Sequence, residues 1–328
     1  MNDAEQQIDE IALNDNLVPS NGNRPQTQHE FSLPPADGGK DAWLVLAGCT
    51  VIEGVVWSLP YSFGVFQDYY SKSEELKGDR SNIALIGTLG LGILYLGSPI
   101  NLLLHRRWPQ HRLKFLISGL LISSLSLTAA SFATRVWQLI LTQGILYAVG
   151  SGMMSYPTMI FLDQWFVRRK GLAFGIAWAS TNFWGVAAPF FVSWSLKHFS
   201  FRTTLRIWVI LTVILATPLI PFIRPRVPAA TGAQFRKINL NFAISAPFLP
   251  LQVGSLLEGF GYFLPGIFLP SYARSLGLST TIATVGVGLI NTGNFFGCIV
   301  IGYLVDRWHV TDVIMLCTVG GTLSVALL

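Results

Sequence analysis

Long apolar runs separated by short polar loops fill the chain after residue 41. All but the last run are close to the ~20 residues that an α-helix needs to cross the hydrocarbon core of a bilayer. The runs cover residues 43–66, 83–104, 113–133, 136–162, 172–196, 205–223, 244–272, 282–305 and 313–328. The pattern therefore predicts an all-α integral membrane protein with eight full transmembrane helices and a partial ninth.

A polar motif occurs twice inside these runs, once in each half of the chain. The motif E-G-x-x-aromatic-x-L-P stands at residues 53–60 and again at residues 258–265. A glycine followed ten residues later by an Arg-Trp pair also recurs: Gly97 with Arg107-Trp108, and Gly297 with Arg307-Trp308. Repeats of this kind are typical of transporters built from two parallel halves. The chain is therefore expected to have such halves.

The repeat and the loops divide the chain into four parts. We expect residues 1–41 to form a disordered cytoplasmic tail, because they are polar and have no apolar core. Residues 42–223 are expected to form an N-terminal six-helix bundle, residues 224–243 a cytoplasmic inter-bundle loop, and residues 244–328 a partial C-terminal bundle with helices seven to nine. A second half as long as the first would extend well past Leu328, so we expect a C-terminally truncated chain.

The composition agrees with a membrane location and sets an orientation. Hydrophobic residues make up 51% of the chain and charged residues 12%, against about 25% charged in soluble domains. Twelve Lys and Arg lie in the loops after the second, fourth, sixth and eighth runs, and eight lie in the alternate loops. This bias predicts a cytoplasmic N-terminus. Because the basic residues are spread over short loops, we expect no nucleic-acid partner.

Candidate catalytic and metal-binding groups do not form any recognisable set in the sequence. The five histidines fall in the tail or the loops, and the three cysteines lie in apolar runs without paired spacing. Neither pattern fits a metal site or a disulfide framework. We therefore expect no cofactor and no enzyme activity.

Three short motifs carry a resemblance to a known family. They are Asp37-Gly38-Gly39 before the first run, the segment SFGVFQDYY at residues 62–70, and WFVRRKGLAFG at residues 165–175. Together they resemble the major facilitator superfamily, and within it the monocarboxylate porter-like transporters of fungal type. The resemblance implies two six-helix bundles around a central cavity that opens alternately to either side of the membrane.

The resemblance also implies a class of function. We expect secondary active transport of a small organic molecule across the plasma membrane or, alternatively, the vacuolar membrane, with protons as one candidate for the coupling ion. The family contains importers of small carboxylates and fungal exporters of secondary metabolites, and both kinds of substrate stay open. A non-transporting membrane sensor or an inactive truncated remnant is the alternative function.

The chain departs from its carboxylate-transporting relatives at positions that normally bind the substrate. Those relatives have a lysine after the proline that ends the first motif, where this chain has Tyr61. They also carry an Asp and an Arg on the eighth helix, where the aligned residues are Asn294 and Cys298. A carboxylate substrate would lack the cation that normally receives it, so proton-driven transport of lactate-like anions is not expected.

The superfamily's cytoplasmic gate motif is only partly present. Its first copy keeps Arg106 and Arg107 but has His105 in place of the acid, whereas the second copy keeps Asp306 and Arg307. An Asp at a helix end can hold two bundles together through an Arg of the other half. We therefore expect Asp306 to pair with Arg168 or Arg169, with simple anchoring of basic loops at the membrane surface as the alternative.

The repeated glutamates are the candidates for the centre of the transport site. Glu53 lies ten residues after Trp43, or about 15 Å along a helix, which places it near the middle of the bilayer. A carboxyl group there could bind a proton, a cation or a substrate donor; the alternative is a neutral acid bonded to a neighbouring helix. The predicted substrate and proton cavity comprises Glu53, Tyr61, Trp178, Asn182, Glu258, Asn291 and Asn294.

Overall fold

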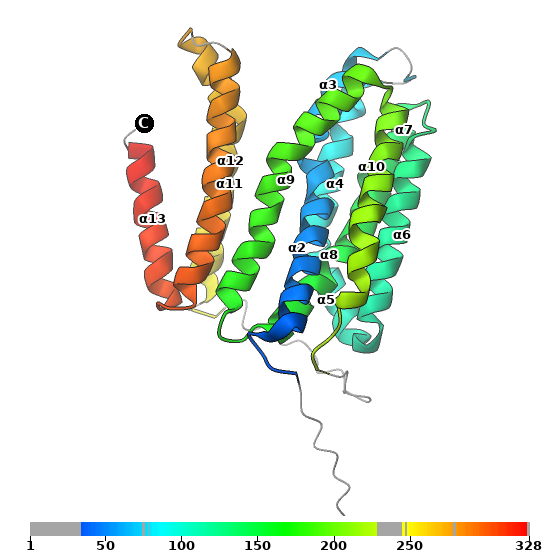
Figure 1. The fold of residues 1–328 in the computed structure, drawn as a ribbon. Helices are drawn as coiled ribbons and strands as arrows, with labels where there is room; N and C mark the ends of the chain where they lie inside the picture. Colours follow the sequence, from blue (N-terminus) through cyan, green and yellow to red (C-terminus); the bar gives the residue numbers. More distant parts are fainter. Residues whose placement is uncertain are drawn as a thin grey trace, which may run out of the picture. The chain divides into compact units, whose positions relative to one another are not determined.

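The computed structural model describes residues 34–73, 76–77, 79–227, 245–246, 248–277 and 280–326. Apart from an isolated backbone bridge between Lys77 and Arg135, its regular structure is helical (Figure 1). The first helices are α2 (Gly39–Tyr61), α3 (Phe63–Lys72), η2 (Arg80–Ile83), α4 (Ala84–Leu96), α5 (Ser98–Arg107), η3 (Pro109–His111), α6 (Arg112–Ala130), α7 (Val136–Leu139) and η4 (Ile140–Leu146). They are followed by α8 (Tyr147–Trp165), α9 (Lys170–His198), α10 (Phe201–Ala216), η5 (Thr217–Phe222), α11 (Phe248–Ser275), α12 (Thr280–Val305) and α13 (Val310–Ala326).

The helices follow the apolar runs of the sequence, so the prediction of an all-α protein is confirmed for the described residues. In this part of the chain, five stretches are long and apolar enough to cross a membrane, and the bent pair α4–α5 adds a sixth. The five are Gly39–Lys72, Pro109–Ala130, Val136–Trp165, Phe201–Phe222 and Gly288–Val305. The count of eight full spans and a partial ninth stays a prediction. Residues 1–33 of the predicted tail and 228–243 of the predicted loop lie outside the description.

Two prolines interrupt the first two spans. Pro60 has no N–H to bond to the carbonyl of Val56, and α2 ends at Tyr61. Helices α4 and α5 meet at Gly97, one residue before Ser98-Pro99, and are bent by 44°. Since the first helical position tolerates proline, Pro99 starts the second segment without strain.

The centre of the described fold is α2, which contacts both α8 and α9. Helix α6 packs against α8, α4 packs against the π-helical segment η4, and α9 also contacts α12. Two apolar clusters fill the first bundle, one around Trp165 and Ile52, the other around Trp208 and Phe66. Glu53 lies on the part of α2 that joins them.

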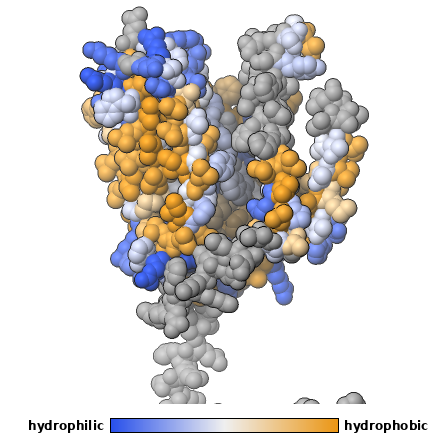
Figure 2. Space-filling model, turned by 180° about the vertical axis from the view of Figure 1, so that it is seen from behind, coloured by the Kyte–Doolittle hydropathy of each residue, from blue (hydrophilic) through white to orange (hydrophobic). Residues whose placement is uncertain are grey.

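The outer surface has the polarity that a bilayer requires. Viewed from behind, orange apolar residues form a band over the first helices, with blue hydrophilic residues at both ends (Figure 2). Exposed side chains such as Leu121, Leu125, Ile210 and Ile214 lie on α6 and α10. Because a soluble protein of this size rarely leaves so large an apolar area exposed, the structure supports the multi-pass membrane location expected from the sequence.

Candidate functional site

The Glu53 side chain is completely buried and is bonded to two helices. On α8, the Ser155 hydroxyl lies 2.8 Å from both carboxyl oxygens, and the Thr158 hydroxyl lies 2.5 Å from Oε1. On α2 itself, the indole N–H of Trp57 donates to Oε2 over 3.2 Å. The carboxyl group therefore joins α2 to α8 in the interior of the bundle, where burial of an ionisable group is costly.

The hydrogens available around Glu53 can satisfy a protonated carboxyl group. The Thr158 hydroxyl has a single hydrogen, and the carbonyl oxygen of Ser155 is a second acceptor within reach. If Oε1 carries a proton and donates it to Thr158, then Thr158 can donate to that carbonyl, while Ser155 and Trp57 donate to Oε2. After loss of the proton, Thr158 must choose between the two acceptors. The network can therefore respond to binding and release of one proton.

Four aromatic rings gather next to this network. Around the Trp57 ring, the centroids of Tyr61, Tyr95 and Trp178 lie at 6.0, 5.2 and 6.0 Å. Tyr61 follows one turn later on α2, Tyr95 comes from α4, and Trp178 comes from α9. We call these four residues the aromatic cluster. Trp57 connects the cluster to Glu53 through its N–H group.

The glycine of the repeated motif has a packing role in the first copy. A Cβ atom on Gly54 would overlap the indole ring of Trp184, which comes from α9. Glycine at this position therefore lets α9 approach the backbone of α2 directly beside Glu53. The contact places α9, which carries Trp178 and Asn182, next to α2.

The face of α9 that carries Trp178 also meets α12. Asn182 lies one turn after Trp178, and its Nδ2 atom is 3.5 Å from the Sγ atom of Cys298. Between α9 and α12 there is a groove of about 200 Å³, lined by Asn182, Phe183, Val186, Ala187, Asn291, Thr292 and Phe295. A Cβ atom on Gly185 would lie 3.6 Å from Tyr61 and 4.0 Å from Asn291 Oδ1, so the groove and the aromatic cluster are neighbours.

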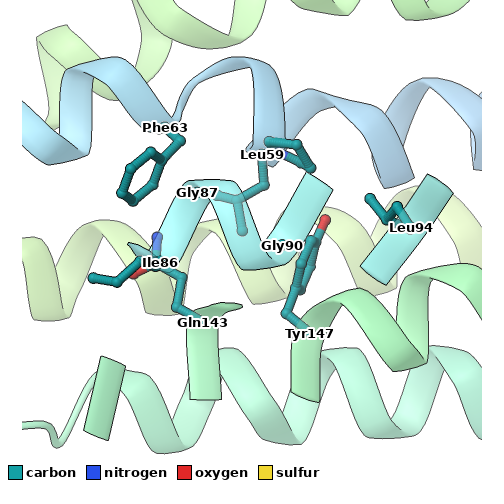
Figure 3. Close-up of a pocket in the computed structure, with 9 residues that line it drawn as sticks. Leu59, Phe63, Ile86, Gly87, Gly90, Leu94, Gln143 and Tyr147 are labelled. Carbon is teal, nitrogen blue, oxygen red and sulfur yellow. The ribbon is translucent and has the colours of Figure 1, made fainter. Parts of the chain in front are cut away.

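A small cavity lies beside the break in α2. Its volume is about 20 Å³, and its lining includes Pro60, Phe63, Gly87, Gln143 and Tyr147 (Figure 3). Tyr147 donates to the carbonyl of Val56, the group that Pro60 leaves without a helical bond. Gln143 accepts from Tyr70 through Oε1, and its buried Nε2 atom has no partner among the described residues. A cavity of this size can hold one water molecule, which would satisfy that amide.

The predicted cavity residues divide into two groups. The structure brings Glu53, Tyr61, Trp178, Asn182 and Asn291 together around α2, α9 and α12. Asn294 is half-buried on α12, whereas Glu258 is exposed on α11. The equivalence that the repeat suggests for the two glutamates is therefore not seen in their surroundings.

Sequence reasoning missed four residues of the site: Trp57, Tyr95, Ser155 and Thr158. Trp57 could have been found, because it lies four residues after Glu53 on the same helical face. The hydroxyl pair at positions 155 and 158 gives a weaker signal, since i, i+3 spacing is common in helices. Nothing in the local sequence points to Tyr95.

Asp306 contacts the first bundle through different atoms from those expected. Its half-buried carboxylate accepts the backbone N–H groups of Gly171 and Leu172, at 2.6 and 2.8 Å. These groups belong to the first turn of α9, where a negative charge is favourable. The partners of Asp306 in the structure are therefore these backbone N–H groups, whereas the sequence predicted the side chain of Arg168 or Arg169.

The arginines of the predicted gate lie at helix ends and are exposed. Arg106 and Arg107 end α5, Arg168 and Arg169 precede α9, and the Arg307 guanidinium lies 4.8 Å from the centre of the Tyr303 ring. Basic side chains at helix ends are compatible with anchoring at a membrane surface. Among the residues of the predicted gate, Asp306 contacts the first turn of α9.

A second carboxylate, Asp37, holds the loop that precedes α9. Its Oδ1 atom accepts the backbone N–H groups of Val167, Arg168 and Arg169 at 2.8, 2.8 and 2.9 Å. Burial opposes ionisation of Asp37, but these bonds outweigh it and lower its pKa below 3.8. The contact therefore stabilises the loop at pH above 3.8, and this contribution is lost as the pH falls through the lowered pKa.

Replacing Asp37 with Ala is expected to release this loop. Loss of three charge-assisted bonds at a partly exposed site should lower the free energy needed to open the loop by about 1–2 kcal/mol. Trypsin cleaves after Lys and Arg, and the loop contains Arg168 and Arg169. Cleavage of the native protein within this loop should therefore become about 5 to 30 times faster. Asp68→Ala is the matched control, because Asp68 is exposed and forms an ion pair with exposed Lys72 on its own helix. Equal cleavage of all three proteins would contradict this role for Asp37.

Comparison with known proteins gives a consistent result. The family model described as Major Facilitator Superfamily matches residues 46–328. The chain is similar to the MFS-type transporter pytF of Aspergillus terreus, with 31% identity over 86% of this chain and 95% of that protein. It is 30% identical to the MFS-type transporter pynF of Aspergillus niger over 87% of this chain.

A third relative carries a more specific description. The Fujikurins efflux protein of Gibberella fujikuroi is 27% identical over 89% of this chain. The match covers 65% of pynF and 63% of the Fujikurins efflux protein, so the chain spans less than two thirds of the length of these two relatives.

Proposed function

Because the chain belongs to the major facilitator superfamily and resembles its fungal transporters, we propose that it is a secondary active transporter. It moves a small organic molecule across a membrane by alternating access, in exchange for or together with protons. Relatives named as efflux proteins support export of a fungal secondary metabolite as the direction and substrate class. The plasma membrane is the expected location, with the vacuolar membrane as the alternative.

The observation that carries this proposal is the position of Glu53. It is a buried titratable group whose network can accept or release a proton, and it is bonded to Trp57 of the aromatic cluster. Coupled transport needs such a link between proton binding and substrate binding. Glu258 is kept as a second candidate residue of the transport site on the evidence of the repeat alone.

The contact between α9 and α12 supports alternating access. At one end of the pair, Asp306 binds the first turn of α9, and the backbone of Gly302 lies against Gly171. Further along, Asn182 and Asn291 line an open groove. We propose that this arrangement is one of two states, closed at the Asp306 end, which is the cytoplasmic end if the N-terminus is cytoplasmic.

The direct test is flux in reconstituted vesicles. Proteoliposomes would be loaded with an extract of fungal secondary metabolites, and release would be followed by mass spectrometry after a pH gradient is imposed. We expect at least one compound to leave faster than from protein-free vesicles, with saturation and dependence on the gradient. Release equal to that of protein-free vesicles for every compound would count against transport.

The second candidate function is a membrane sensor, which uses the same site without moving its ligand. Tyr61, Asn294 and Cys298 stand where carboxylate transporters have charged residues. A protein with this site could bind a ligand without carrying it across the membrane. Equilibrium binding of the same extract to the protein in nanodiscs separates the two functions. Binding with no release from vesicles would favour the sensor.

A further inference from the structure

The aromatic cluster offers partly exposed ring surface beside a buried acid. Tyr61 and Trp178 are each 38% exposed and Tyr95 is 50% exposed, whereas Trp57 is only 6% exposed. The Trp57 and Tyr61 rings are stacked, with an angle of 26° between their planes. The bond from Trp57 to Glu53 orients the Trp57 ring, and the other three rings of the cluster lie around it at 5.2–6.0 Å.

The charges near this cluster have one sign. The helices around the rings contain long stretches without Lys or Arg. These stretches are residues 41–71 (most of α2 and α3), 81–105 (α4 and most of α5), 171–196 (most of α9) and 275–306 (including α12). Glu53 is the acid that α2 places beneath the rings, and the polar groups next to them are the neutral amides Asn182 and Asn291. A carboxylate ligand would lose its hydration here without gaining a cationic partner, which is costly.

Aromatic faces and neutral amides favour a different ligand. Flat rings stack on Trp and Tyr side chains, and cations are attracted to the same faces. Amide groups can donate to or accept from hydroxyl and carbonyl groups of a ligand. Each of these contacts is available without a basic side chain.

We propose, building on the transport function proposed above, that this site takes flat aromatic molecules that are uncharged or cationic and rejects anionic carboxylates. The ligand stacks on Trp178, Tyr61 and Tyr95, and its polar groups face Asn182 and Asn291. Trp57 contacts the other three rings of the cluster and also bonds to Glu53. It therefore transmits ligand binding to the hydrogen-bond network of Glu53.

Three compounds that share the naphthalene ring and carry a neutral, a cationic or an anionic substituent test this proposal. Binding of tritiated 2-naphthylmethanol, 2-naphthylmethylammonium and 2-naphthoate is measured on the chain in neutral-lipid nanodiscs, with binding to empty nanodiscs subtracted. We expect saturable binding of the alcohol and the ammonium compound, and binding of the carboxylate that is at least about tenfold weaker, which corresponds to about 1.4 kcal/mol. Equal affinity for all three, or preference for the carboxylate, would overturn the proposal.

A pair of variants on one helix locates the binding. Trp178→Ala should weaken binding of the alcohol and the ammonium compound by about fivefold or more, because a stacked ring is lost. Trp194→Ala is the matched control, since Trp194 is also an exposed tryptophan of α9 but contacts His198 and Phe199 instead of the cluster. Equal loss in both variants, or no loss in either, would contradict the assigned site. Binding is measured without flux, so a failure of transport would leave this result standing.

Discussion

Glu53→Gln is expected to abolish coupling to protons while preserving the fold and the binding of substrate. The Gln amide can donate to Thr158 through its nitrogen and accept from Trp57 and Ser155 through its oxygen. It therefore imitates the protonated carboxyl group and cannot release a proton. Flux driven by a pH gradient should fall by about tenfold or more, equivalent to about 1.4 kcal/mol.

The measurement compares two kinds of transport in proteoliposomes. Net flux driven by a pH gradient requires a proton to leave the network, whereas exchange of labelled for unlabelled substrate at equal pH does not. In Glu53→Gln, the first should be lost with its pH dependence, and the second should persist. Asp68→Asn, which neutralises an exposed acid of α3, serves as the control and should leave both unchanged. Gradient-driven flux in Glu53→Gln at the level of the parent would reduce Glu53 to a structural hydrogen-bonding residue.

Gly302→Leu is expected to prevent closure at the Asp306 end of α9 and α12. A Cβ atom on Gly302 would overlap the carbonyl oxygen of Gly171, and one on Gly175 would overlap that of Cys298. The two backbones are therefore in direct contact, and a larger side chain must separate them. Overpacking of this kind costs about 1–3 kcal/mol, and the bonds from Asp306 to the first turn of α9 would be lost as well.

Reactivity of Cys298 reports this separation. The residue is half-buried against α9, whereas Cys49 is buried and Cys317 is exposed, so the test uses a Cys317→Ser background. N-ethylmaleimide should label Cys298 about five to a hundred times faster in Gly302→Leu, and transport should be lost. Gly293→Leu, on the same helix, is the matched control, because an added Cβ there meets no atom within 4 Å. Equal labelling of Cys298 in Gly302→Leu and in the parent would show that the contact does not set the closed state.

The sequence by itself determined the helices and the membrane character. Hydrophobic runs predict helix positions because burial in lipid depends on the composition of each segment, not on its partners. Prolines in the apolar runs indicate interrupted helices, because proline lacks the N–H that a helix uses. Pro60 and Pro99 do lie at the breaks at the end of α2 and between α4 and α5, whereas Pro157 and Pro189 lie inside continuous helices. Glu53 was recognised as a candidate because a carboxyl group in an apolar run is costly wherever the run packs.

Tertiary structure alone decided how these residues are used. Glu53 and Glu258 share a motif, yet Glu53 is buried against Ser155 and Thr158 while Glu258 is exposed. Asp306 was expected to meet an arginine and instead meets backbone N–H groups, and Asp37 binds a loop 130 residues away. Such contacts depend on which helix faces lie together, and local hydropathy carries no information about that. The class of protein could therefore be predicted from the sequence, whereas the hydrogen-bond partners of its charged groups could be identified only from the three-dimensional structure.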